Sequence, residues 1–384
     1  MSAPNDSADS TAVSTVDSTV LRVATAAPYD VVVGHGVLDR LRGLLPAGVQ
    51  RVAIITPESL EDLLEPFADL LEGLDVIVLQ VPDGEEAKNW EVAAACWESL
   101  GEEGFTRSDA VVTLGGGATT DLGGFVAATW LRGVAVVHIP TTVLAMVDAA
   151  VGGKTGINTP AGKNLVGSFH EPAGVLCDLA LLATLPRAEI VAGLGEVVKC
   201  GFIADPRILE LVETAEPAAL TADSPVLREL VERAIRVKAD VVAGDLKETG
   251  GADGHPGREV LNYGHTLAHA IEKATDYSVR HGEAVAVGCV YVAELAARAG
   301  GLSPELVARH RAAFDRVGLP TSLSGWSGVD FDTLLAAMRV DKKARGNQLR
   351  FVVLEDLARP VVLAGPSETD LRAAYTALSG RAGS

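Results

Sequence analysis

Hydrophobic and polar positions in the first half of the chain follow two alternating periods. Short apolar runs rich in Val and Ile predict buried strands at residues 51–56, 75–81, 110–114 and 134–140. Between them, apolar residues three or four positions apart predict amphipathic helices at residues 60–74, 90–104 and 120–131. Strands that alternate with helices are typical of a parallel sheet with helices on both faces, so the pattern predicts an α/β fold.

The pattern changes after Pro186. Long helical periodicities at 186–204 and 225–245 dominate the second half, which ends in a predicted β-hairpin at 349–363 and a short helix. We therefore predict an α/β domain over residues 21–186 and a mainly α-helical domain over residues 187–384.

Two segments lack a periodic pattern. Residues 1–20 are rich in Ser, Thr, Ala and Asp and have neither the basic nor the apolar region of a signal peptide. We expect them to be a disordered tail. Residues 249–257 are predicted to be a glycine-rich loop.

The composition excludes several classes of function. The chain of 384 residues carries 32 Lys and Arg against 51 Asp and Glu, a net charge of −19, and so lacks the basic excess expected of a nucleic-acid-binding protein. No apolar run is long enough to span a membrane. The four cysteines are scattered without C-x-x-C spacing, which predicts reduced thiols in a cytoplasmic protein and no thiolate zinc site.

Two glycine-rich stretches are candidates for ligand binding. The stretch 114–121 (LGGGATTD) falls where a strand should turn into a helix, a place where backbone N–H groups can face a phosphate. A tight turn without a ligand is the alternative. The stretch 151–158 (VGGKTGIN) fails as a P-loop because Asp148 occupies the position of the first glycine. Asp148 and Lys154 remain a candidate polar pair near a ligand, or part of a solvated loop.

A third set of residues suggests a metal. Glu196 and Lys199 lie one helical turn apart among apolar residues, where charges need partners or a metal. His265 and His269 also share a helix face, and His281 begins a further helical stretch. Two histidines and a carboxylate suit zinc, although each histidine could simply be a satisfied core residue. The glutamate of the hydrolase motif H-E-x-x-H is absent.

Taken together, these stretches resemble the 3-dehydroquinate synthase family from about residue 20 to the end. The resemblance rests on eight segments in order: 83–89 (DGEEAKN), 115–133, 139–158, 162–172, 195–201 (GEVVKCG), 261–272 (LNYGHTLAHAIE), 280–288 (RHGEAVAVG) and 341–343 (DKK).

The resemblance implies an NAD-binding α/β domain, a helical metal- and substrate-binding domain, and an active site between them. It implies conversion of 3-deoxy-D-arabino-heptulosonate 7-phosphate to 3-dehydroquinate and phosphate. In the family, a substrate hydroxyl is oxidised by NAD⁺, phosphate is eliminated, the ketone is reduced again, and the opened ring closes by aldol addition. NAD⁺, a divalent metal (Zn²⁺ or Co²⁺) and a homodimer are thus expected.

The same resemblance implies roles for particular residues. The expected metal ligands are Glu196, His265 and His281, and the expected catalytic residues are Lys199, Glu248 and His269. The expected NAD contacts are Asp83, Gly84, Glu85, Glu86, Ala87, Lys88, Gly115, Gly116, Gly117, Ala118, Thr119, Thr120, Asp121, Thr141, Thr142, Lys154, Lys163, Leu181, Leu182, Ala183 and Thr184. The expected substrate contacts are Arg132 (from the neighbouring subunit), Asp148, Lys154, Asn164, Lys199, Lys238, Arg258, Asn262 and Lys342.

Three other functions compete with this one. Other sugar phosphate cyclases share the cofactors, but Lys238, Arg258, Asn262 and Lys342 match the dehydroquinate synthase pattern for a carboxylated substrate. Metal-dependent polyol dehydrogenases share the glycine turn and would release NADH. A catalytically inactive NAD- or metal-binding protein is the third. The sequence also departs from the family pattern at Ala118–Thr120, Met146, Leu246 and a short insertion, 251–256, before Arg258.

Overall fold

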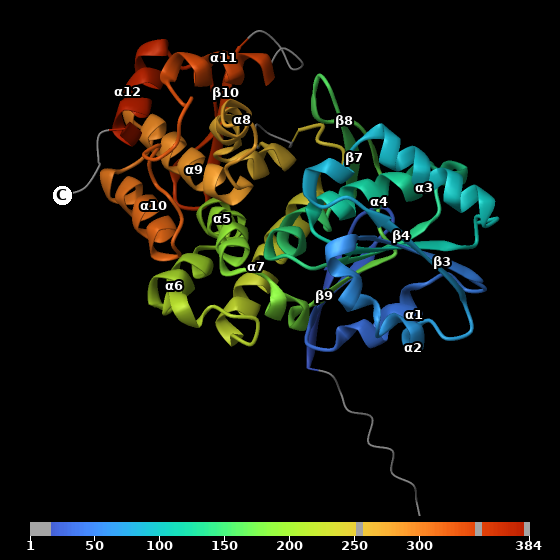
Figure 1. Cartoon of the computed structure of the whole chain (residues 1–384). Helices are drawn as coiled ribbons and strands as arrows, with labels where there is room; N and C mark the ends of the chain where they lie inside the picture. Colours follow the sequence, from blue (N-terminus) through green and yellow to red (C-terminus); the bar gives the residue numbers. More distant parts are fainter. Residues whose placement is uncertain (1–16, 251–255, 342–347, 380–384) are drawn as a thin grey trace, which may run out of the picture.

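The computed structural model describes residues 17–250, 256–341 and 348–379 (Figure 1). Most of the expected N-terminal tail lies outside these residues, but its end was predicted wrongly. Strand β1 (Ser18–Val23) begins inside the expected tail and pairs antiparallel with β2 (Tyr29–Gly34). The alternation of STVLRV buries Leu21 and Val23, and this burial is enough to fix the segment as an edge strand.

The first half is built on a seven-stranded sheet in the order β1-β2-β9-β6-β5-β3-β4. All strand pairs except β1–β2 are parallel. The remaining strands are β3 (Arg51–Pro57), β4 (Asp75–Val81), β5 (Ala110–Gly115), β6 (Ala135–Pro140) and β9 (Gly174–Asp178). The predicted α/β fold with a parallel sheet is confirmed.

Both faces of this sheet are covered, as parallel strands require. Ala53 and Ile55 of β3 pack on one side with α3 (Trp90–Glu102) and α4 (Gly117–Thr129), whereas Val52 and Ile54 pack on the other. The second side is covered by short helices: η1 (Val37–Arg40), α1 (Leu41–Leu44), η2 (Glu58–Leu64) and α2 (Phe67–Leu70).

The single helix predicted at 60–74 is therefore wrong. Pro66 interrupts it because proline lacks the N–H that a continuous helix would need there, and α2 begins directly after it. The sequence pattern also missed β2, β9 and a hairpin of β7 (Lys154–Thr159) and β8 (Gly162–Phe169). This hairpin stands beside α4, between the sheet and the helical half (Figure 1).

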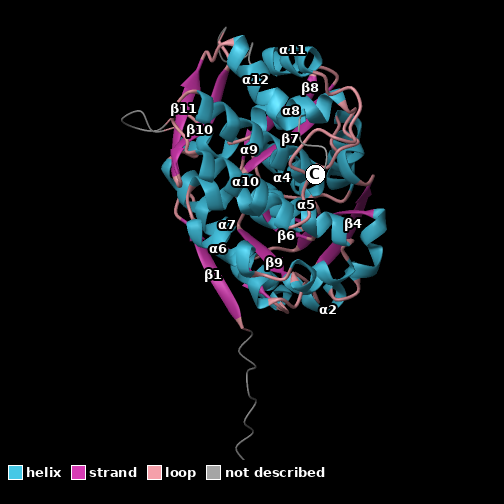
Figure 2. Cartoon of the chain, turned by 90° about the vertical axis from the view of Figure 1, so that its left-hand side faces the viewer, coloured by secondary structure: helices cyan, strands magenta, loops and turns pink. Residues whose placement is uncertain are grey.

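The second half is mainly helical, as predicted (Figure 2). It contains α5 (Arg187–Ile203), α6 (Pro206–Thr214), α7 (Pro225–Gly244), η9 (Gly257–Asn262), α8 (His265–Ala274), α9 (His281–Arg298), α10 (Pro304–Arg316), α11 (Phe331–Asp341) and α12 (Glu368–Ser379). The predicted hairpin is β10 (Arg350–Asp356) and β11 (Arg359–Ala364). The division into domains at residue 186 stays a prediction.

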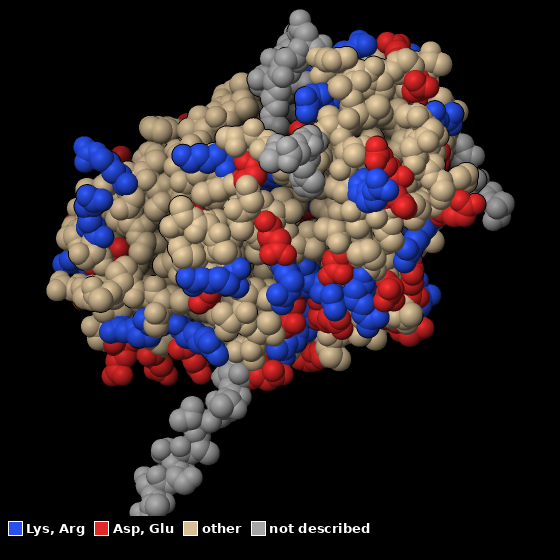
Figure 3. All heavy atoms as spheres, turned by 180° about the vertical axis from the view of Figure 1, so that it is seen from behind, with Lys and Arg blue, Asp and Glu red and all other residues tan. Residues whose placement is uncertain are grey.

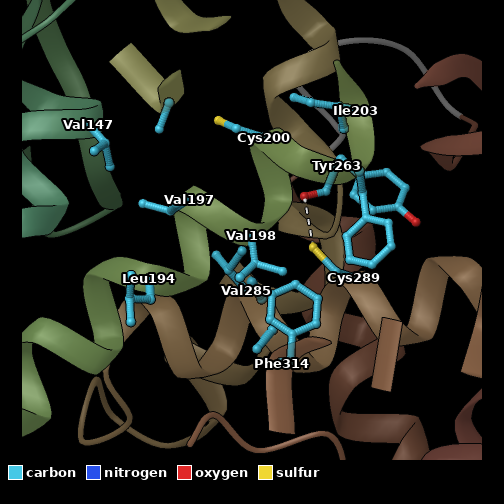
Figure 4. Close-up of a cluster of buried hydrophobic side chains, with 14 of the residues drawn as sticks. Val147, Leu194, Val197, Val198, Cys200, Ile203, Tyr263, Val285, Cys289 and Phe314 are labelled. Atoms are coloured by element: carbon cyan, nitrogen blue, oxygen red, sulfur yellow. Dashed lines mark hydrogen bonds between the residues drawn. The ribbon is translucent and has the colours of Figure 1, made fainter. Parts of the chain in front are cut away.

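Helix α5 lies in the core of this half. Its side chain Val198 packs beside Val285 of α9 and Phe314 of α10, whereas Val197 points towards Val147 (Figure 4). Glu196 and Lys199 are only 2% exposed on the same helix. Two charges in so apolar a helix need a local electrostatic reason.

The surface agrees with the acidic composition. On the face shown in Figure 3, Lys and Arg side chains are interspersed with Asp and Glu side chains and form no broad basic area. Among the described residues, no helix is both long and apolar enough to cross a membrane.

Candidate functional site

Three predicted ligands converge from three helices of the second half. Glu196 lies on α5, His265 begins α8, and His281 begins α9. One ligand atom from each lies within 4.8 Å of the others. His265 Nε2 is 3.3 Å and His281 Nε2 is 3.6 Å from Glu196 Oε1, so both ring nitrogens face the same carboxylate oxygen.

The partners of the other ring nitrogens orient both histidines. His265 Nδ1 lies 3.1 Å from the carbonyl oxygen of Tyr263, and His281 Nδ1 lies 3.4 Å from Glu272 Oε1. A ring that donates its Nδ1 hydrogen keeps the Nε2 lone pair free for a metal. Helix packing thus presents two imidazole nitrogens and one carboxylate oxygen to one point.

The electrostatics of this point fit a divalent cation. Glu196 Oε1 is buried and has no hydrogen-bond partner among the described residues. Burial would raise the pKa of Glu196, but Lys199 and the two histidines hold it well below its usual range. An ionised carboxylate oxygen without a hydrogen-bond partner, beside two imidazoles, is the donor set of a catalytic zinc site with room for further ligands. The residues therefore fit the expected metal.

Lys199 completes the buried charge cluster. It forms an ion pair with Glu196 one turn away, and its Nζ donates to the Leu261 carbonyl at 2.7 Å. Burial would lower the pKa of Lys199, but the Glu196 carboxylate raises it above its usual value. The side chain therefore stays cationic beside the proposed metal ligands.

The predicted nucleotide turn joins β5 to α4. Gly115 ends the strand, and Gly116 caps the helix in an extended conformation. A Cβ on Gly115 would lie 2.5 Å from Thr119 Oγ1, so the turn fits closely against the first helical turn. On Gly116 the nearest contact would be 3.5 Å away, which leaves its backbone approachable from outside. The N-terminus of α4 can therefore receive a pyrophosphate.

Three neighbouring segments surround this turn. Lys88, buried after η3 (Gly84–Ala87), pairs with Asp121 of α4 at 2.7 Å, and its Nζ is 3.8 Å from Glu85. Thr141 N donates to the Gly115 carbonyl, and Thr142 follows it beyond β6. The expected contacts 181–184 lie in η6 (Leu179–Thr184), directly beyond β9. The carboxyl ends of parallel strands thus gather these residues at one edge of the sheet.

A cleft of about 400 Å³ opens beside the turn. Four predicted site residues line it: Asp121, Lys154, Asn164 and Glu248. The other lining residues come from the β7–β8 hairpin: Thr155, Gly156, Leu165, Gly167, Ser168 and Phe169. The cleft is large enough for part of a small polar ligand.

Asp148 and Lys154, the candidate polar pair of the sequence, each form an ion pair with another residue. Lys154 lies 3.1 Å from Glu248, and Asp148 forms its ion pair with Lys238 of α7. Asp148 lies on the π-helical turn Ala145–Ala149, which packs against α7. Lys154 is the first residue of β7, which belongs to the hairpin beside α4. Burial would raise the pKa of Asp148, but Lys238 lowers it to about 2, so the carboxylate stays ionised.

Arg258 is buried, at 2% exposed, and is largely engaged with the backbone. One terminal nitrogen donates to the Leu246 carbonyl at 2.7 Å and the other to the Gly152 carbonyl at 3.1 Å. Its Nε is buried without a partner among the described residues. These contacts use two of the five N–H donors of the guanidinium, so the others remain for a substrate carboxylate.

The other predicted residues are placed as follows. Asn262 ends η9, three residues before the first residue of α8, and exposed His269 has its ring centroid 5.4 Å from that of His265. Lys163, on β8, lies 3.8 Å from both Glu85 and Glu272. Arg132 is exposed beyond the far end of α4, roughly 20 Å from the glycine turn by helical rise. Lys342 lies outside the described residues.

Two residues of the site were missed from the sequence. Glu272 contacts His281. The Asn158 side chain donates from Nδ2 to Glu85 at 2.6 Å, and its Oδ1 accepts a hydrogen bond from the Asn164 N–H. Glu272 stands seven positions after His265 on the same helix face, and this spacing was the available signal. Asn158 had no comparable signal because its role depends on how the unpredicted hairpin folds.

Comparison with known proteins agrees with this geometry. The model for the 3-dehydroquinate synthase N-terminal region matches residues 78–192, and the model for the C-terminal region matches residues 193–344. A 3-dehydroquinate synthase of Thermobifida fusca is 55% identical over 367 residues, covering 94% of this chain and 97% of its own. One of Streptomyces avermitilis is 57% identical, covering 91% and 94%.

Solved structures share the fold. A 2-deoxy-scyllo-inosose synthase complexed with carbaglucose-6-phosphate, NAD⁺ and Co²⁺ has a TM-score of 0.80 at 25% identity, covering 93% of this chain and 99% of its own. A 2-epi-5-epi-valiolone synthase of Streptomyces hygroscopicus with NAD⁺ and Zn²⁺ has a TM-score of 0.82 at 25% identity, covering 91% and 96%. The chain thus belongs to the 3-dehydroquinate synthase family.

Proposed function

We propose that this protein converts 3-deoxy-D-arabino-heptulosonate 7-phosphate to 3-dehydroquinate and phosphate, as a phosphate-eliminating lyase that uses NAD⁺ and Zn²⁺ or Co²⁺. One observation carries the proposal. His265 and His281 converge on a buried oxygen of Glu196 that has no hydrogen-bond partner among the described residues. They do so in a chain more than half identical to proteins named for this activity.

Each half of the protein would supply one cofactor site. The glycine turn at the N-terminus of α4, with Lys88 and Asp121 behind it, suits the pyrophosphate of NAD⁺. Glu196, His265 and His281 would hold the metal. When bound, the metal supplies Lewis acidity towards a substrate hydroxyl and carbonyl, and NAD⁺ supplies a reversible hydride acceptor.

Lysine side chains of both halves suit an anionic substrate. Lys154, whose side chain is 49% exposed, lines the cleft with its ammonium beside Glu248. Lys199 stays charged beside the Glu196 carboxylate, and Lys238 forms an ion pair with Asp148. Such ammonium groups can bind phosphate and carboxylate oxygens through charge-assisted hydrogen bonds.

Proton transfer would fall to groups around the same cleft. Glu248 can accept a proton, and it can exchange protons with Lys154, whose Nζ lies 3.1 Å away. Exposed His269 lies one helical turn beyond His265 and is the imidazole best placed to exchange protons with a ligand at the metal site. Neither step requires the base of a zinc hydrolase, because the substrate's own hydroxyl takes the place of the activated water.

A single assay tests the activity and separates its rivals. The full-length protein is incubated with the heptulosonate, NAD⁺ and Zn²⁺, while phosphate, dehydroquinate and NADH absorbance are followed. We expect steady release of phosphate and dehydroquinate without accumulation of NADH. Stoichiometric NADH would indicate a polyol dehydrogenase, and a preference for sedoheptulose 7-phosphate would indicate a valiolone-type cyclase. Absence of every product would leave only a binding protein.

Matched variants test the ligand assignment. His281→Ala should lose bound metal more severely than His269→Ala, because only His281 belongs to the proposed ligand set. His35→Ala, which removes an exposed histidine near Asp223, is the control and should retain metal and turnover. Equal metal retention in His281→Ala and the control would refute the assignment.

We also infer a homodimer and a cytoplasmic location. Arg132 is exposed at the far end of α4, too far from the glycine turn to serve its own site, so a second copy is what it would reach. Light scattering on the purified chain tests this. All four cysteines are buried and free, which suits a reducing compartment.

A further inference from the structure

Glu272 is a buried carboxylate with no place in the catalytic set described so far. It lies on α8, seven residues after His265 and three after His269, so all three side chains share one helix face. Only 7% of the residue is exposed. A buried carboxylate is costly unless it is paired, so its partners indicate its purpose.

The partner that matters is a metal ligand. Glu272 Oε1 lies 3.4 Å from His281 Nδ1, while His281 Nε2 faces Glu196 Oε1 at 3.6 Å. The two nitrogens of one ring are therefore divided between two carboxylates. We propose that Glu272 is a positioning residue of the metal centre, which fixes the orientation and tautomer of His281 so that Nε2 is offered to the metal.

The comparison with His265 supports this assignment. His265 is oriented by the backbone carbonyl of Tyr263, which the fold supplies whatever the side chain. His281 is the first residue of α9, and the carboxylate of Glu272 is the acceptor found at its Nδ1. A carboxylate behind a metal-bound imidazole also increases the basicity of the ligand, which a carbonyl does less strongly.

A contact from the other half of the protein holds Glu272 itself. Lys163 Nζ, on the β7–β8 hairpin, lies 3.8 Å from Glu272 Oε1 and 3.8 Å from Glu85 Oε1. Its ammonium also lies 3.9 Å from the centroid of the Tyr277 ring. Glu272 is thus fixed between a cation from the nucleotide half and a histidine of the metal half.

The test measures metal affinity rather than turnover. Because the inference rests on the proposed metal, the full-length wild type is first titrated with Co²⁺ against a chelating dye, and its visible spectrum is recorded. Glu272→Gln should weaken Co²⁺ binding about 10–100-fold and change the spectrum. Glu283→Gln is the matched control, since Glu283 lies on the same helix as His281 but contacts Arg280. Its affinity should be unchanged.

A double-mutant cycle separates positioning from a general effect of charge. Once His281→Ala has removed the ring, Glu272→Gln should cause no further loss of Co²⁺ affinity. An equal loss in both backgrounds, or wild-type affinity in Glu272→Gln, would overturn the proposal. If the Gln variant does not fold, Glu272→Asp decides, because it keeps the charge but draws the carboxylate back from Nδ1. A wild type that binds no Co²⁺ would refute the metal centre instead.

Discussion

Close packing of α5 against α9 sets the position of the proposed metal ligands. The substitution Gly282→Ala tests whether this packing is needed for metal binding. Gly282 directly follows His281, and a Cβ built on it would lie 1.7 Å from the carbonyl oxygen of Ala192. Real Cβ atoms hardly come closer than 3.0 Å to such an atom, so Gly282→Ala requires a displacement of about 1.3 Å. The obstacle is backbone and cannot rotate away.

The displacement that Gly282→Ala requires would move the proposed metal ligands apart. Glu196 lies four residues after Ala192 on α5, and His281 precedes Gly282 on α9, so moving the helices apart separates these two ligands. Metal sites tolerate changes in ligand distance of only about 0.2 Å. We therefore expect Gly282→Ala to weaken Co²⁺ binding by about 100-fold or more, as when a supporting group is removed entirely. Overpacking should also lower the free energy of unfolding by about 1–3 kcal/mol or more.

A graded series makes the reasoning refutable. A Cβ on Gly195 would lie 2.5 Å from the Gly282 carbonyl oxygen, which requires only about 0.5 Å of movement, so Gly195→Ala should lie between Gly282→Ala and wild type. Gly244→Ala, at the end of α7 with nothing within 4 Å, is the neutral control. Co²⁺ titration and thermal melting of the metal-free proteins measure both effects. Wild-type affinity and melting in Gly282→Ala would refute the packing argument.

Three further predictions follow from other parts of the site. Chelation should abolish turnover, and Zn²⁺ or Co²⁺ should restore it; full activity in metal-free protein would contradict the metal centre. Gly116→Val should weaken NAD⁺ binding, measured by calorimetry, by about tenfold or more, because its side chain would occupy the approachable side of the turn. Burial lowers the pKa of His310 to about 4. As the pH falls, His310 is therefore protonated in the unfolded chain before it is protonated in the folded chain. The free energy of unfolding should fall by up to about 1.4 kcal/mol per pH unit between about pH 6.5 and 4. His310→Gln should lose that part of the slope in urea titrations, and an unchanged slope would contradict it.

Local sequence signals predicted the elements that repeat a simple period. The strands β3, β5 and β6 follow from short apolar runs, because they are buried on both faces, and the helices α3, α5 and α7 follow from helical apolar spacing. The helix at 60–74 failed at Pro66, whose effect on the backbone is local and could have been read from the sequence. The hairpin β7–β8 was missed because its residues follow no apolar period of their own. Its position depends on contacts with α4 and with the helical half.

Chemistry was predictable where one residue type has few alternatives. The family resemblance implied Glu196, His265 and His281 as metal ligands, and the structure brings one ligand atom of each within 4.8 Å of the others, while their role stays a prediction. Which cation pairs with which carboxylate was not predictable, because Lys154 and Asp148 take partners from chain segments nearly a hundred residues away. Arg258 shows the same limit: the sequence identifies a cation, but only the fold shows that two backbone carbonyls already hold it.

The two kinds of group in this site are held with different rigidity, and their tasks explain why. The proposed metal ligands come from helices packed so closely that glycine is required between them, because coordination tolerates little change in distance. Several of the cations expected to meet the substrate are instead paired with carboxylates, as in Lys154–Glu248 and Lys238–Asp148. Such a pairing holds each ammonium in place before the substrate arrives. The substrate's own anionic oxygens then need only compete with an existing carboxylate, and do not have to order a flexible side chain.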